Sequence, residues 1–287
     1  MYQLLYILIK LVVHLPKWLK YLLELKLFII IYYLFGYRKQ VVLDNLQLAF
    51  PDRSIRSLKK LRKQFYKHLI DVFMETIQPL AWNKQQMQDH YKLLNVELVE
   101  RAAEKGSVLL LGGHYANWDW VCSIASWISK PAYVVYQPIS SGHFDKLVHL
   151  IRSRFGSIMV PNGKVAKTVL SNQRKGLTAI YTMVSDQSPM LTMAKLWLPF
   201  MGVEVPVHTG AASLAVKSKM SVFYIKTHRV SKNHYEVDFE ELIDDASKTD
   251  EVTLTKAYFN SLEKQIKKEP TYYFWTHKRW KHAGKKP

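Results

Sequence analysis

Residues 109–120 read LLLGGHYANWDW, and they are the most informative part of the chain for its fold. Its continuous apolar start is typical of a buried strand. Gly112 and Gly113 then allow a sharp turn, His114 stands at the carboxyl end of the strand, and Asn117 is placed to cap a following helix. Open α/β sheets bind their ligands at that edge. The stretch therefore predicts an α/β sheet with a site that contains His114.

The flanking sequence extends this pattern in both directions, because short apolar runs alternate with helical stretches. We expect strands at residues 107–111, 132–136, 157–160, 177–185, 221–227 and 234–242. We expect helices at 54–80, 117–129, 141–155, 165–175, 210–219 and 250–268. Such alternation predicts an α/β fold with a mixed, largely parallel sheet flanked by helices. The alternating run at 234–242 favours an edge or antiparallel strand.

The helix expected at residues 54–80 has two faces. Its apolar stripe consists of Leu58, Leu61, Phe65, Leu69, Val72, Phe73 and Ile77. A basic face carries Arg56, Lys59, Lys60, Lys63 and Lys67. This pattern is that of an amphipathic helix that can lie near anionic head groups, or of an ordinary solvated helix.

The first 36 residues contain two apolar runs, MYQLLYILIKLVV and LFIIIYYLFG. Each is shorter than the ~20 residues of a perpendicular membrane span, so each is half of a tilted span, a re-entrant pair or an interfacial helix. No small-residue processing site follows, and Arg38 and Lys39 come directly after, as on a cytoplasmic boundary. We expect a retained membrane anchor at 1–36 and a catalytic domain at 37–287, with a pair of buried core helices as the alternative.

Charge and cysteine content limit the compartment and the partners. Lys and Arg number 41 against 23 Asp and Glu, which gives a formal charge of +18 that attracts nucleic acid, acidic lipid or an acidic protein. Cys122 is the single cysteine, so an intramolecular disulfide and a four-cysteine zinc site are excluded and a reducing compartment is favoured. His114 has no His or Cys partner at a zinc-binding spacing, and we expect no metal and no cofactor.

His114 and Asp119 suggest a general-base pair. A histidine oriented by a carboxylate accepts a hydroxyl proton, and the carboxylate stabilises the imidazolium that forms. In the first turn of the following helix, the Asp119 side chain can fold back toward His114. A hydroxyl activated in this way attacks a thioester directly, without a protein nucleophile. The backbone N–H groups at the start of that helix, or a guanidinium, would stabilise the oxyanion.

Four ordered blocks of the sequence resemble the bacterial lipid A biosynthesis (lauroyl or myristoyl) acyltransferases, within the lysophospholipid acyltransferase superfamily. These blocks are GYRKQVVLDNLQLAFP, GGHYANWDW, SDQSP with the following LPFMGVEVPVHTG segment, and YYFWTHKRWK. Together they span residues 35–282. The resemblance implies a glycerol-3-phosphate acyltransferase-like fold, a membrane anchor, an acyl-carrier-protein thioester as donor and a lipid A precursor as acceptor.

The resemblance also assigns site residues. His114 and Asp119 match the catalytic pair, and an arginine after the second strand helps the site; of Arg152 and Arg154 we prefer Arg154, because Phe-Gly follows it directly. We expect the substrate-binding residues to be Asn117, Arg152, Asp186, Gln187 and Arg229. From the resemblance we expect a secondary acyltransferase of lipopolysaccharide biosynthesis at the cell inner membrane, with its catalytic domain on the cytoplasmic side.

Three alternatives remain open. The acceptor can be a lysophospholipid, a glycolipid or an amino-acid lipid, and the donor can be acyl-CoA. A basic membrane- or nucleic-acid-binding protein without catalysis would explain the charge, but no helix-turn-helix, zinc-finger or RNA-recognition signature is present, so we expect no nucleic-acid partner. A serine lipase would need a Gly-x-Ser-x-Gly elbow, which the sequence lacks.

Overall fold

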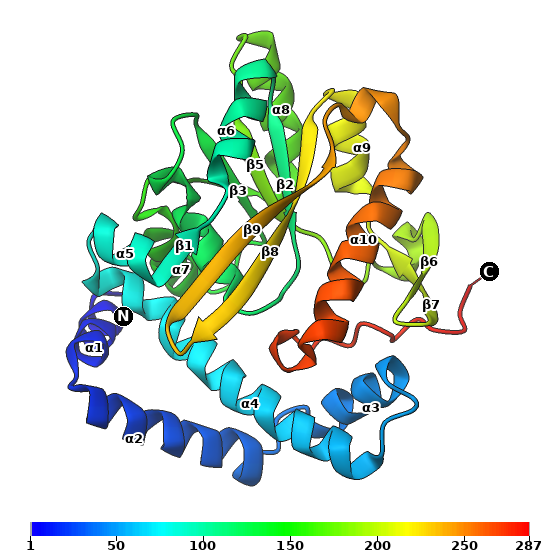
Figure 1. Ribbon diagram of the computed structural model, residues 1–287. Coiled ribbons are helices and arrows are strands. Elements are labelled where there is room, and N and C mark those ends of the chain that lie inside the picture. Colours follow the sequence, from blue (N-terminus) through cyan, green and yellow to red (C-terminus); the bar gives the residue numbers. More distant parts are fainter. Residues whose placement is uncertain (1, 287) are drawn as a thin grey trace.

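Strand β2 (Val108–Gly112) lies in the middle of a seven-stranded sheet, and all five of its residues are buried. The computed structural model describes residues 2–286, so Met1 of the expected anchor and Pro287 of the expected catalytic domain lie outside the described part. The sheet has the order β1-β9-β8-β2-β5-β3-β4 (Figure 1). The other strands are β1 (Tyr91–Leu93), β3 (Ala132–Tyr136), β4 (Ile158–Pro161), β5 (Ile180–Val184), β8 (Ser221–Ser231) and β9 (His234–Ile243).

Neighbouring strands of this sheet are parallel, except for β8 and β9, which are antiparallel. The expected largely parallel sheet flanked by helices is therefore confirmed, as is the antiparallel position of 234–242. Helices α5 (Lys84–His90), α6 (Val96–Lys105), α8 (Val165–Arg174), α9 (Gly210–Lys217) and α10 (Glu251–Lys268) flank it. Of these, α6 contacts β2, β8 and β9, α8 contacts β4, and α10 contacts β8 and β9.

Three strands were not expected from the sequence. Strand β1 has only three residues, too few for a periodic signal. Strands β6 (Leu196–Phe200) and β7 (Val203–Val207) form a separate antiparallel hairpin beside α10 (Figure 1). Each of these two strands contains a proline, which argues against a strand in sequence analysis. Their turn residues Met201 and Gly202 both have positive φ, as a two-residue hairpin loop of type I′ requires.

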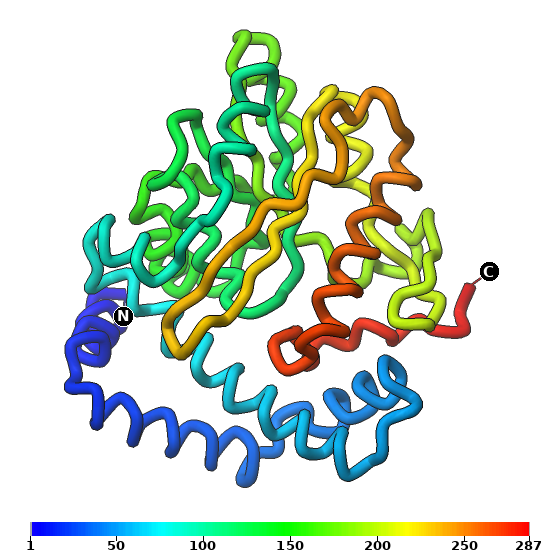
Figure 2. The backbone as a smooth tube through the Cα atoms, viewed as in Figure 1, coloured from blue at the N-terminus to red at the C-terminus, as the bar shows by residue number. Residues whose placement is uncertain are grey.

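The N-terminal segment forms two short helices and a π-helical turn. These are α1 (Tyr2–His14), α2 (Lys17–Phe28) and η1 (Ile29–Leu34), with Pro16 between the first two. Figure 2 shows this blue segment along the lower side of the molecule, where α2 runs beside α4 (Ile55–Ile77). Among residues 2–286, none of the helices combines the length and the apolar character that a membrane crossing requires.

Half of the apolar side chains in this segment are exposed and only Val13, Phe28 and Tyr32 are buried, so the alternative of two buried core helices is wrong. Val13 and Phe28 are the buried residues of α1 and α2. Part of α1 packs on Leu147 and Ile151 of helix α7 (Gly142–Ser153). The exposed members are Leu4, Ile7, Leu8, Leu11, Trp18, Tyr21, Leu22, Leu25, Ile29, Ile30, Tyr33, Leu34 and Phe35.

Helix α4 is amphipathic as expected. Ser54 caps its N-terminus by accepting a hydrogen bond from the backbone N–H of Ser57 at 3.3 Å. Leu58, Leu61, Phe65, Leu69 and Val72 are buried, whereas Phe73, expected on the same stripe, is 56% exposed. The five basic residues of the other face are all exposed. Helix α3 (Lys39–Ala49) packs against α4 and completes this side of the molecule.

Candidate active site

His114 stands directly beyond β2, as the sequence predicts. At Gly113 the backbone packs closely against α10, because a Cβ atom at this position would lie 2.6 Å from Cδ1 of Leu262. Only glycine fits there without a shift of Leu262. Tyr258 of the same helix donates its hydroxyl hydrogen to the backbone oxygen of Gly112 at 2.7 Å. The backbone oxygen of His114 accepts from the N–H of Phe274 at 2.9 Å. These contacts fix the backbone of His114 from two sides and leave its side chain 20% exposed.

The carboxylate that contacts the imidazole comes from Asp186. Its Oδ1 lies 2.6 Å from Nδ1 of His114, and the residue is 1% exposed. Asp186 follows β5, whose last residue Val184 is in register with Gly112 of β2. Since neighbouring parallel strands end at the same edge of a sheet, the two side chains meet there. Burial alone would raise the pKa of Asp186, but the nearby His114 and hydrogen bonds outweigh it and hold the pKa below its usual value.

This contact fixes the tautomer of the imidazole. An ionised carboxylate only accepts hydrogen bonds, so Nδ1 of His114 carries a hydrogen and Nε2 of the neutral ring has a free lone pair. The side-chain nitrogen of Gln187 lies 3.2 Å from this Nε2. Trp118 and Phe274 stand beside the ring, with ring centroids 5.4 Å and 5.9 Å from that of His114. The base nitrogen thus faces an aromatic, partly exposed surface.

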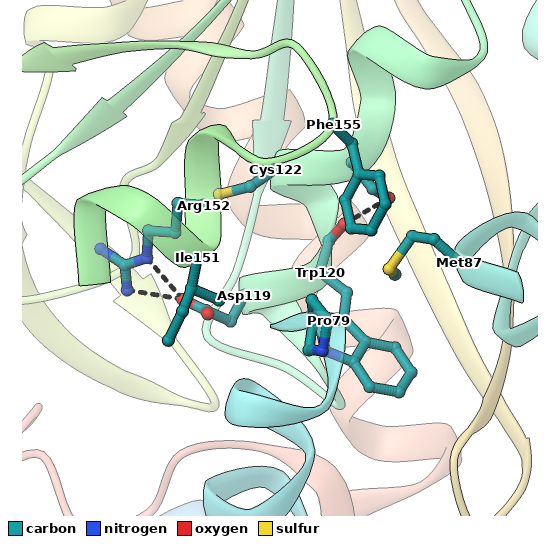
Figure 3. A pocket seen from close by; sticks show the side chains of 9 residues that line it. Pro79, Met87, Asp119, Trp120, Cys122, Ile151, Arg152 and Phe155 are labelled. Carbon is teal, nitrogen blue, oxygen red and sulfur yellow. Dashed lines mark hydrogen bonds and ion pairs between the residues drawn. The ribbon is translucent and has the colours of Figure 1, made fainter. Parts of the chain in front are cut away.

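Asp119 occupies a different position from the one expected. It lies in the 3-10 helix η3 (Trp118–Ser126), which turns its carboxylate toward α7. There Arg152 donates from Nε at 2.8 Å and from a terminal nitrogen at 2.5 Å to Oδ1 of Asp119 (Figure 3). Within residues 2–286, His114 and Asp119 share no hydrogen bond or ion pair. The expectation that Asp119 folds back onto His114 is therefore corrected, and its direct partner is a guanidinium.

The two arginines near the end of α7 have different partners. Arg154, which we preferred from the sequence, is exposed and donates from Nε at 3.3 Å and from a terminal nitrogen at 3.0 Å to the backbone oxygen of Trp82. Arg152 lies two residues earlier, about half a helical turn away, and its side chain reaches Asp119. Because both arginines have similar sequence neighbours, only the packing of α7 against η3 separates them.

Asn117 has the capping role that the sequence predicts. Its Oδ1 accepts a hydrogen bond from the backbone N–H of Trp120 at 3.2 Å. Its Nδ2 donates to Oε2 of Glu75 at 2.8 Å, and Asn117 is fully buried. Tyr235 donates its hydroxyl hydrogen to the same oxygen of Glu75 at 2.7 Å. The packing thus gives Asn117 a structural position and no accessible surface for a substrate.

Glu75 is the residue of this region that sequence analysis missed. It is 1% exposed in the last turn of α4, and burial raises the pKa of its carboxyl. The sequence could have revealed it, because Glu75 follows Val72 by three residues and so lies on the apolar face of the helix. A carboxylate on that face needs buried hydrogen-bond partners. Through Asn117, Glu75 connects α4 to the turn that follows His114.

Arg229 is held in place near the end of β8. One terminal nitrogen donates to Oδ2 of Asp71 at 2.6 Å, and the other lies 3.1 Å from Nδ1 of His68. Burial, together with the adjacent guanidinium, lowers the pKa of His68 to about 3, so this ring is neutral at pH 7. Asp71 neutralises the charge of Arg229, which leaves less of it for a ligand phosphate.

The C-terminal block supports the segment after Asp186. Nε2 of His277 accepts from the backbone N–H of Ser188 at 3.2 Å, and the Ser188 hydroxyl donates to the backbone oxygen of Arg279 at 2.7 Å. Arg279 is fully buried, although it lies in a basic stretch near the C-terminus. Trp275 and Trp280 are stacked at 5.9 Å between ring centroids and are buried, so they are packing residues.

Two pockets adjoin Phe155. The smaller, of about 10 Å³, is lined by Asp119 and Arg152 together with apolar groups such as Ile151 and Met87 (Figure 3). The larger, of about 440 Å³, is lined by Trp82, Asn83, Lys84, Ser126, Arg154 and Phe155. Neither is lined by His114, whose exposed face is reached from the surface. Among residues 2–286, no group of three or more His, Cys, Asp or Glu side chains has a metal-binding arrangement.

The buried thiol takes no part in this arrangement. Burial raises the pKa of Cys122 to about 12, so it stays protonated and is not a nucleophile at pH 7. The fold and the His114–Asp186 pair at its strand edge fit an enzyme that activates a hydroxyl or water. The comparisons with known proteins identify this enzyme as an acyltransferase.

The family profile described as "Bacterial lipid A biosynthesis acyltransferase" matches residues 2–282, so the chain belongs to this family. The chain is 25% identical over 253 residues to the "Lipid A biosynthesis lauroyltransferase" of Escherichia coli (strain K12), which covers 85% of this chain and 79% of the relative. It is 21% identical over 247 residues to the "Lipid A biosynthesis acyltransferase" of Haemophilus influenzae (strain ATCC 51907 / DSM 11121 / KW20 / Rd), with 85% and 78% coverage.

Proposed function

We propose that this protein transfers a fatty acyl group from an acyl-carrier-protein or acyl-CoA thioester to a hydroxyl of a lipid A precursor. The observation that carries this proposal is the buried Asp186 at 2.6 Å from Nδ1 of His114, whose side chain is 20% exposed. Membership of the family supports a lipid acceptor and an activated acyl donor. His114 acts as the general base, and no covalent acyl-enzyme forms.

The reaction follows from the charges of the site. Asp186 accepts the Nδ1 hydrogen of His114, so Nε2 takes the proton of the acceptor hydroxyl as its oxygen attacks the thioester carbon. The carbonyl electron pair moves onto oxygen and a tetrahedral intermediate forms. When the intermediate collapses, the C–S bond breaks and the leaving thiolate takes the proton from Nε2. The ester and the free thiol are the products, and His114 is neutral again.

The remaining candidate residues have supporting roles in this proposal. Asp119 and Arg152 act as a positioning pair that fixes the start of η3 beside His114. Arg154 and Lys84, at the larger pocket, provide positive charge for a phosphate of the donor. Arg229 positions the hairpin of β8 and β9 against α4 through Asp71 and serves as a second anion site only if that ion pair opens.

We also propose that the chain works at the cytoplasmic face of the inner membrane. The exposed apolar side chains of α1, α2 and η1 form a surface of a size that soluble monomers rarely leave in water. The exposed basic face of α4 and the net charge of +18 add attraction to anionic lipid. A membrane position also keeps water from the thioester during transfer.

The test is an acyl-transfer assay with purified protein in lipid vesicles. A lauroyl thioester of acyl carrier protein is offered with a tetraacylated lipid A precursor, and in parallel with a lysophospholipid, and products are read by mass spectrometry. The proposal predicts one new acyl ester on the lipid A precursor. Transfer to the lysophospholipid alone would assign a different acceptor, and absence of transfer to either would contradict the proposed activity.

A further inference from the structure

The side-chain amide of Gln187 occupies the position where the acceptor hydroxyl has to bind. Its nitrogen lies 3.2 Å from Nε2 of His114. Since Asp186 fixes the hydrogen of the ring on Nδ1, Nε2 is an acceptor, and the amide N–H donates to it. A hydroxyl can transfer its proton to Nε2 only after it has displaced this amide.

The backbone around Gln187 is fixed, so displacement moves the side chain alone. Asp186, on one side, is buried and bound to His114. Ser188, on the other side, is bound by His277 and Arg279. Gln187 itself is half-buried between them. When the Gln187 side chain rotates away from Nε2 of His114, its amide therefore stays close to the acceptor hydroxyl and the thioester carbon that react there.

Other donors near His114 already have partners. The backbone N–H of Tyr115 donates to the oxygen of Gly113 at 2.7 Å, and that of Ala116 donates to the oxygen of Tyr272 at 2.9 Å. The guanidinium of Arg152 is bound to Asp119. Of the donors that the sequence suggested for an oxyanion, the N–H of Trp120 is bound to Asn117 and a guanidinium, that of Arg152, to Asp119, whereas the amide of Gln187 would be released by the substrate itself.

We propose that Gln187 is a catalytic residue: displaced from Nε2 by the acceptor hydroxyl, its amide N–H donates to the oxyanion of the tetrahedral intermediate. This inference rests on the proposed general-base function of His114. When the hydroxyl proton moves to Nε2, the new O–C bond forms and the carbonyl pair moves onto oxygen. Nε2–H no longer accepts a hydrogen bond, so the amide cannot return and stays with the oxyanion. Collapse of the intermediate transfers this proton to the thiolate and restores the resting contact.

The test compares Gln187→Leu, Gln187→Glu and Gln187→Asn with the wild type in the vesicle assay. Loss of a donor that acts only in the transition state lowers kcat and leaves KM nearly unchanged. For Gln187→Leu we expect kcat to fall by roughly 10²–10³-fold, with KM within about threefold. Gln187→Asn keeps the amide and should recover part of kcat. Gln187→Glu should lose as much as Leu and move the acidic limb of the pH–rate profile to higher pH, because a carboxylate favours the protonated ring.

Gln88→Leu is the matched control, because Gln88 donates its amide hydrogen to the backbone oxygen of Ser126 at 2.7 Å, on another part of the chain. It should retain wild-type kcat. The inference is overturned if Gln187→Leu turns over within about threefold of wild type while His114→Ala is inactive. If His114→Ala is as active as wild type, the proposed function fails instead. If Gln187→Leu does not fold, the Glu and Asn variants decide by the same kcat and pH criteria.

Discussion

Oδ1 of Asp186 lies 2.6 Å from Nδ1 of His114, although 71 residues separate the two in the chain. The contact joins the ends of β2 and β5, which are neighbours in the sheet. An NMR spectrum of the imidazole protons tests it without any substrate. We predict a strongly downfield Nδ1 proton of His114 that disappears in Asp186→Asn and persists in Asp119→Asn. Loss of the signal in Asp119→Asn alone would restore Asp119 as the orienting carboxylate.

The two arginines of α7 should differ in their effect on stability. Arg152→Met leaves the carboxylate of Asp119, which is 7% exposed, without its partner, and breaking such a pair costs about 3 kcal/mol of unfolding free energy. Arg154→Met removes an exposed contact and should change stability by no more than about 0.5 kcal/mol. Urea unfolding of both variants measures the difference. Equal stability of the two variants would mean that the Asp119–Arg152 pair contributes nothing.

Acid should destabilise the fold through histidines that are neutral when folded. Burial lowers the pKa of His277 to about 4, and that of His68 to about 3. Unfolded histidine has a pKa of about 6.5, so the unfolded chain binds more protons below that pH. The neutral side chains of His68 and His277 therefore cost no free energy of unfolding above about pH 6.5. As the pH falls from there toward 4, the free energy of unfolding decreases.

His277→Gln checks this prediction, because glutamine does not titrate and can still accept the hydrogen bond from Ser188. The variant should lose less stability than the wild type between pH 7 and pH 4.5, as measured by the urea midpoint. Parallel curves for both proteins would show that His277 is already solvated and protonates normally.

Much of the fold follows from the sequence, and the site does so only in part. The six expected strands and the α4 stripe are present because short apolar runs and a helical period are both local signals in the sequence. His114 and Asn117 were placed correctly since a strand end and a helix cap are local features. Which carboxylate meets the imidazole depends on strand order, which no local pattern encodes. Asp186 was therefore assigned to substrate and Asp119 to His114, whereas in the structure Asp186 contacts His114 and Asp119 contacts Arg152.

The exposed leucines of α1 should contribute most of the membrane affinity. Leu4, Leu8 and Leu11 are each at least 50% exposed, and burying a leucine side chain is worth about 1.5–3 kcal/mol when complete. Changing all three to serine should weaken vesicle binding by at least about tenfold in sedimentation. The control changes Leu170 and Leu177, exposed elsewhere on the surface, to serine and should bind as the wild type does. Equal loss in both variants would argue against α1 as the membrane surface.

The role of His114 as the base is tested by the rate of a single turnover of acyl transfer by His114→Ala. Loss of the general base should lower this rate by roughly 10²–10⁴-fold. The variant should also unfold at a lower temperature, because buried Asp186 loses its partner, so the rate is measured well below that temperature. A rate within a few-fold of wild type, from a folded variant with the same thioester and lipid acceptor, would contradict the role of His114 as the base.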